Sequence, residues 1–116
     1  MEEKINTRFR YIRLNRHPIG VLVTQDAGNN NVYVGVSFWN KADPSDWGLA
    51  KRTALGRLEK ERSSPVASKD WIIKEAYPMR ATMPRTALIE MIYAIKDARR
   101  DKDIKSIVRK ALAGKK

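Results

Sequence analysis

A pattern of short runs rich in aromatic and β-branched residues covers much of the first forty positions of the chain and is typical of β-strands, with a clear period of two in the run at 32–39. It predicts strands at 8–14, 21–24 and 32–39, separated by a turn at His17–Gly20 and by a polar loop at Gln25–Asn31. Because these connections are short, we expect an antiparallel meander. In the third strand the valines and Phe38 share one face, and the other face carries Tyr33, Gly35, Ser37 and Trp39.

A period of three to four residues replaces the alternation further along and predicts a helix over 47–62. Ser45 or Asp46 is suited to cap its start, and Pro65 follows its end. One stripe of this helix is apolar: Trp47, Ala50, Ala54 and Leu58, with Leu55 beside them. This stripe predicts the face that packs against the rest of the protein.

The last third of the chain predicts two more amphipathic helices within about 84–113. Pro84 stands at the favoured first position of the earlier one, after a cap at Thr82 or Met83. The segment 71–77 fits either a fourth strand or a short extended stretch.

Strands followed by helices predict an α+β fold, with an antiparallel sheet of three to four strands packed against two or three helices. The 116 residues, 42% of them hydrophobic, predict a single domain over 1–116 with its sheet at about 7–39. The absence of cysteine excludes thiol chemistry. No apolar run approaches the roughly 20 residues of a membrane helix. The charged N-terminus leads into no apolar run, so we expect an intracellular, cytoplasmic protein with no membrane partner.

The charge of the chain changes this picture most. Twenty-four Lys and Arg stand against thirteen Asp and Glu, which gives a net charge of +11 and a sequence pI near 10.2. Such a surplus is expected of a protein that binds a polyanion, above all nucleic acid. The alternative is that the charge serves solubility alone.

Residues suited to catalysis are few. The chain has a single histidine, His17, and no phosphate-binding loop of the G-x-x-x-x-G-K-[ST] type. Three carboxylate pairs could hold a magnesium ion: Asp43 with Asp46, Glu59 with Glu61, and Asp70 with Glu75. Helix capping explains the first pair, and residues two apart on a helix point to different faces. We therefore expect no enzyme, no metal and no cofactor.

Aromatic and basic residues are interleaved on the predicted strands. In the first strand Arg8, Arg10 and Ile12 alternate with Phe9, Tyr11 and Arg13. If the valine row of the third strand meets the helices, Tyr33, Ser37 and Trp39 face away from the core. Rings that project from a basic sheet can stack on the bases of a single strand, at about 1–3 kcal/mol for each base.

This pattern predicts binding of single-stranded DNA or RNA by phosphate neutralisation and stacking. The expected contact residues are Arg8, Arg10, Tyr11, Arg13, Tyr33, Trp39, Lys41, Lys51 and Arg52. Core packing is the competing interpretation, in which Phe9 and Tyr11 lie under the helices and Trp39 anchors the loop before 47. A further basic cluster, expected to attract phosphates without specificity, comprises Arg99, Arg100, Lys102 and Lys105.

The stretch from Tyr33 to Asp43, with the small and basic residues that follow it, resembles small basic proteins of unassigned role encoded by phages and plasmids. Those following residues are Gly48, Ala50, Arg52, Ala54 and Arg57. The resemblance covers 33–57 only. It implies an accessory role in DNA metabolism or host takeover, and it implies nothing about mechanism.

Another class of function uses the same side chains. A protein-binding module could grip an acidic partner such as a polymerase or nuclease and regulate it, since exposed Tyr, Trp and Arg are frequent interface residues. Non-specific binding to double-stranded DNA stays open as well. The amphipathic C-terminal segment packs either within the chain or across a two-fold axis, as in a homodimer.

Overall fold

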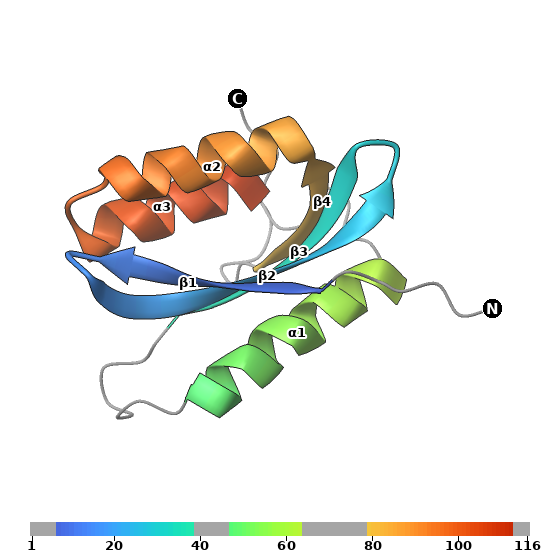
Figure 1. The fold of residues 1–116 in the computed structure, drawn as a ribbon, viewed down its shortest axis with the longest axis horizontal. Helices are drawn as coiled ribbons and strands as arrows, with labels where there is room; N and C mark the ends of the chain where they lie inside the picture. The colour runs from blue at the N-terminus through green and yellow to red at the C-terminus, as the bar shows by residue number, and fades with distance from the viewer. Residues whose placement is uncertain (1–6, 39–46, 64–78, 113–116) are drawn as a thin grey trace, which may run out of the picture.

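The computed structural model describes residues 7–38, 47–63 and 79–112, which form four strands and three helices. In chain order they are β1 (Arg8–Leu14), β2 (His17–Gly28), β3 (Asn31–Phe38), α1 (Trp47–Ser63), β4 (Arg80–Pro84), α2 (Arg85–Asp97) and α3 (Asp101–Leu112). The strands make one sheet between two layers of helix. Figure 1 shows α1 on one face of the sheet and α2 with α3 on the other.

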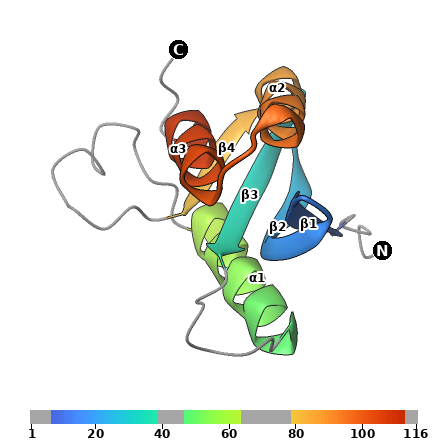
Figure 2. The same cartoon turned by 90° about the vertical axis from the view of Figure 1, so that its left-hand side faces the viewer.

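The sheet is antiparallel throughout, in the order β1-β2-β3-β4. The predicted α+β class and the meander of the first three strands are therefore confirmed. β4 comes after α1 in the chain and returns to pair with β3, so β1 and β4 are the edge strands. Seen from the end of the sheet, α2 lies over the β1 side and α3 over the β4 side (Figure 2).

The strand ends differ from the sequence prediction. His17–Gly20, expected as a turn, and most of the loop expected at 25–31 belong to β2. The actual turns need only two residues each, Asn15–Arg16 and Asn29–Asn30, because all four adopt positive φ and close tight hairpins of type I′ form. Pro18 is accommodated where the register of β1 and β2 shifts at an irregularity after Ile12.

β4 was not predicted. Its residues were expected to cap a helix beginning at Pro84, but Pro84 is the last residue of β4 and α2 begins at Arg85. In β4 Ala81 pairs with Val34 and Met83 with Val32, which extends the valine face of the sheet. The ambiguous segment 71–77 lies outside the described residues, as do the expected caps Ser45 and Asp46.

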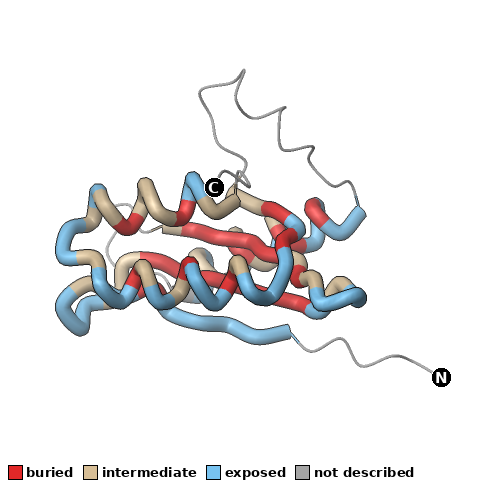
Figure 3. Tube along the Cα trace, turned by 90° about the horizontal axis from the view of Figure 1, so that it is seen from above, coloured by how far each residue is buried: buried red, intermediate tan, exposed pale blue. Residues whose placement is uncertain are grey.

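The core has two parts, one on each face of the sheet. The larger part fills the space beneath α2 and α3, where the β3 valines meet Leu88, Met91, Ile95, Ile104 and Val108. The smaller part lies beneath α1 and consists of Val21, Val23, Ala54 and Leu58. The face opposite the valines was expected to be open, and this is wrong because α1 covers it. Figure 3 shows the central strands buried and β1 exposed beside them.

Gly35 allows α1 to approach the sheet this closely. A Cβ placed on Gly35 would collide with the carbonyl oxygen of Ala54 and would lie 2.7 Å from the backbone nitrogen of Leu58. The main chain of α1 therefore rests directly on the main chain of β3. A glycine in a strand often marks such close contact between two backbones.

Polar contacts fix the position of α1 along the sheet. The buried carboxylate of Glu61 accepts a hydrogen bond of 2.8 Å from the Thr82 hydroxyl and lies 3.4 Å from the Arg80 guanidinium. Arg57 donates to the carbonyl oxygen of Val36 at 2.6 Å, and Arg62 donates to Gln25 at 3.0 Å. These bonds join successive turns of α1 to β2, β3 and β4.

Candidate nucleic-acid interface

β1 presents two rings on the uncovered margin of the α1 face. Its register pairs Phe9 with Val23 and Tyr11 with Val21, and both valines lie in the core beneath α1. Because α1 packs mainly across β2, β3 and β4, the rings at the β1 edge stay open to solvent. Phe9 is 43% exposed and Tyr11 is 41% exposed.

Two cations lie against these rings. The Lys51 Nζ of α1 is 6.0 Å from the centre of the Phe9 ring and 5.5 Å from that of Tyr11. The Arg13 guanidinium carbon is 5.6 Å from the Tyr11 ring centre. We call these four residues, Phe9, Tyr11, Arg13 and Lys51, the β1 platform. Each cation–π contact contributes about 0.5–1 kcal/mol at an exposed site, which favours the close position of the cations and rings.

Three of the nine predicted contact residues thus come together: Tyr11, Arg13 and Lys51. Phe9 completes the group, although the sequence alone did not decide whether its ring packs in the core or is exposed. Its signal was the alternation with arginine on both sides, together with its place on the same strand face as Tyr11.

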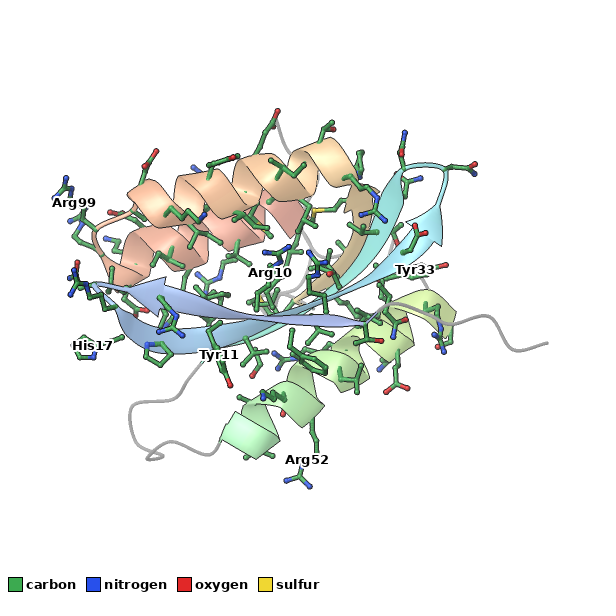
Figure 4. All side chains as sticks on the ribbon, in the orientation of Figure 1. Arg10, Tyr11, His17, Tyr33, Arg52 and Arg99 are labelled. Carbon is green, nitrogen blue, oxygen red and sulfur yellow. The ribbon has the colours of Figure 1, made fainter. Side chains whose placement is uncertain are left out.

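Of the other predicted residues, the four that the structure describes lie outside the β1 platform. Arg8 and Arg10 are exposed on the opposite face of β1, and in Figure 4 Arg10 projects toward α2 while Tyr11 projects toward α1. Arg52 is exposed on α1 and points away from the sheet (Figure 4). Tyr33 is partly buried against the core beneath α1, so the expectation that it faces away from the core is wrong. Trp39 and Lys41 lie outside the described residues.

The charged residues of the β1–β2 hairpin up to Gln25 are all of one sign. Between Thr7 and Gln25 there are four arginines and neither Asp nor Glu. The ion pairs found in the described ranges use other cations, namely Arg80, Arg85, Arg100 and Lys105. The arginines of this hairpin therefore contribute a positive electrostatic potential along the β1 edge.

The carboxylates do not form a metal site in the described part of the chain, where no three His, Asp or Glu side chains gather. Glu61 is buried in its bonds to Arg80 and Thr82, whereas Glu59 is exposed. The other proposed magnesium ligands, Asp43, Asp46, Asp70 and Glu75, lie outside the described residues.

Among the described residues, Asp26 and Arg57 have shifted pKa values, and both groups make contacts within the fold. The Gly28 backbone N–H, which donates to Asp26, lowers the pKa of that carboxylate against slight desolvation, and nearby Arg85 lowers it further. Desolvation of the Arg57 guanidinium, which is partly buried between α1 and the sheet, lowers the pKa of that group. Neither group belongs to the β1 platform.

No protein-family model, curated protein or solved structure matches the chain. The resemblance of 33–57 to small phage and plasmid proteins stays a prediction. Of the described helices, none has the length and apolar character to cross a membrane. The function is therefore argued from the β1 platform itself.

Proposed function

We propose that the protein binds single-stranded nucleic acid at the β1 platform. Phe9 and Tyr11 stack on bases, and Arg13 and Lys51 contact the neighbouring phosphates. The observation that supports this function best is the pair of exposed rings on one strand face, with a cation within about 6 Å of each. The ring can stack on the base of a nucleotide while the cation contacts its phosphate.

A single strand fits this site better than a duplex. In a duplex the base faces are covered by their neighbours in the stack, whereas an unpaired base can turn its face to a ring. Phe9 and Tyr11 are two residues apart on a strand, or about 6.6 Å, so two bases can each find a ring. Bases of DNA and RNA have the same aromatic faces, and we expect the platform to accept both.

The remaining arginines of β1 extend the electrostatic part of the site. Arg8 and Arg10 lie on the opposite face of the same edge strand, where they attract the backbone as it passes. Neutralisation of two phosphates gives a salt dependence of log K against log salt near −1.4, and four phosphates give about −2.8. Because single-stranded nucleic acid is found inside cells, we expect the protein to act in the cell interior. We expect it to need no cofactor and to catalyse no reaction.

The experiment is a titration of fluorescein-labelled oligo(dT), followed by anisotropy between 50 and 500 mM salt. Phe9→Ala and Tyr11→Ala should each weaken binding by about 5- to 150-fold, which corresponds to the loss of one stacked base. The chain offers a matched control in Tyr93 of α2, a 64% exposed ring with Lys96 at 5.7 Å. Tyr93→Ala should leave the affinity unchanged. Equal affinity of Tyr11→Ala and wild type would refute the platform.

A protein ligand is the second candidate function. β1 is an edge strand, so one of its sides carries main-chain groups that no described strand pairs with. An acidic extended segment of a polymerase or nuclease could add there beside the arginines, and the protein would then regulate that partner. This function predicts no oligonucleotide binding, and it predicts binding of an acidic peptide that survives Tyr11→Ala.

A further inference from the structure

The turn between β1 and β2 places a large charged residue where the backbone favours glycine. Asn15 and Arg16 have φ values of 50° and 71°, the geometry of a type I′ turn. Glycine is the usual second residue of this turn, because a Cβ is crowded at positive φ. The equivalent turn between β2 and β3 uses Asn29 and Asn30, and asparagine tolerates this conformation.

Arg16 is unusual among the positive-φ residues of the described ranges. Besides Arg16, these are asparagines, Gly28 and Met79. The Met79 side chain packs against the core beneath α2 and α3, which accounts for its presence. Arg16 is exposed, so packing does not account for it. A residue held in a costly backbone conformation with no packing role is a candidate for a functional contact.

The turn lies at the same end of the molecule as the connection between α2 and α3 (Figure 1). Figure 4 shows His17 and Arg99 projecting at this end, from the hairpin and from that connection. Both side chains are exposed. Two nearby carboxylates of α3 are engaged by cations of that region: Asp103 lies 3.0 Å from Arg100, and Asp101 lies 3.2 Å from Lys105. Among the described residues next to this connection, Asp97 at the end of α2 is a further acidic side chain.

We propose that Arg16 and Arg99 form a second phosphate-binding point for the same strand, with His17, next to Arg16 in the chain, as a further hydrogen-bond donor. This inference rests on the proposed function. The ligand backbone leaves the β1 platform and follows β1 toward its turn. Five residues separate Tyr11 from Arg16, which is roughly 16 Å of strand. Nucleotides rise about 3.4 Å when stacked and can roughly double that spacing when splayed. The second point therefore engages a ligand about two to five nucleotides beyond the stacked bases.

Arg16→Gly separates this role from a structural one. The substitution removes the cation and relieves the turn, so the melting temperature should rise by a few degrees. Affinity for a dT 12-mer should fall, and its salt slope should flatten by about 0.7. Affinity for a dT 3-mer, which covers the two stacked bases and only one nucleotide beyond them, should be unchanged. Asn30→Gly is the matched control, because it relieves the other turn without removing a charge and should leave binding of both oligonucleotides unchanged.

The outcomes distinguish this inference from the proposed function. If the wild type binds neither oligonucleotide, the platform itself is refuted. If Tyr11→Ala weakens binding but Arg16→Gly binds the 12-mer with unchanged affinity and salt slope, only the second phosphate-binding point is refuted. Arg99→Gln provides the same test without altering the turn. Its control is Lys110→Gln, an equal loss of charge near the other end of α3, and equal 12-mer affinities of these two variants would also overturn the inference.

Discussion

Replacement of glycine by alanine should lower the stability of the protein at Gly35 and raise it at Gly56. The difference arises because Gly35 lies against the backbone of α1, whereas Gly56 has open space around it. Gly35→Ala adds a methyl group that collides with the Ala54 carbonyl and lies 2.7 Å from the Leu58 nitrogen and 3.0 Å from its Cβ. Two of these three atoms belong to the helix backbone, so no side-chain rotation can relieve the overlap. α1 must move away from the sheet as a unit.

The loss of stability in Gly35→Ala depends on the side chains that α1 buries. Insertion of one methyl group into a well-packed core costs about 1–3 kcal/mol when the surroundings can shift. Ala54 and Leu58 are both fully buried beneath α1, and a shift that uncovers Leu58 raises the loss toward the 2–5 kcal/mol of a Leu→Ala change. We therefore expect Gly35→Ala to destabilise the protein by about 2–4 kcal/mol.

Gly56→Ala is the control on the helix that moves. Gly56 is exposed within α1, and a Cβ there meets no atom within 4 Å. Alanine is the better helix former by about 1 kcal/mol, so this variant should be more stable than wild type.

Urea unfolding followed by far-UV circular dichroism measures both variants. Lys51 and Gly56 belong to the same helix as Ala54, so displacement of α1 should also weaken oligonucleotide binding in Gly35→Ala and leave it intact in Gly56→Ala. An unfolding midpoint of Gly35→Ala equal to that of wild type would show that α1 does not rest on β3 as described.

Two further predictions concern charged groups of the fold. Glu61→Ala leaves the largely buried Arg80 without this carboxylate and should cost about 3–5 kcal/mol, measured by urea unfolding; a loss below 1 kcal/mol would contradict the buried pair. The pKa of Asp26 is lowered, first by the Gly28 N–H and then by Arg85. The ionised carboxylate therefore stabilises the fold above its ordinary pKa of 3.8, and this stabilisation is lost as the pH falls through the lowered pKa. Asp26→Asn should therefore lower stability at pH 6 and flatten the acid side of the stability profile below about pH 4; parallel profiles of the two proteins would contradict this.

Repeating patterns in the sequence predicted those strands and helices that bury a long row of side chains, such as β3 and α2. The alternation through Val32, Val34 and Val36 and the helical spacing of Leu88 and Ile95 each repeat several times, so the period is visible without tertiary information. β4 has only two inward residues, Ala81 and Met83, and two repeats do not define a period. Its strand conformation depends on pairing with β3 rather than on its own composition.

The covered second face had a signal that could have been used. Gly35 stands between two valines in a strand, and the helix stripe contains the small residue Ala54. Together they indicate a close approach of two backbones, which places a helix on the Tyr33 face and removes Tyr33 from the site. By contrast, the position of Lys51 over Phe9 and Tyr11 depends on the docking of α1, about forty residues further along, and no local pattern contains it.

Protection of the sheet edge does not account for the composition of β1. An exposed edge strand risks pairing with another chain, and charged side chains such as those of Arg8, Arg10 and Arg13 oppose this. The rings of Phe9 and Tyr11 act in the other direction, because exposed aromatic residues on an edge strand promote association. A strand selected only to stay unpaired would carry polar residues at both positions. The rings beside Lys51 therefore favour the proposed ligand, because nucleic acid has both aromatic faces and negative charge.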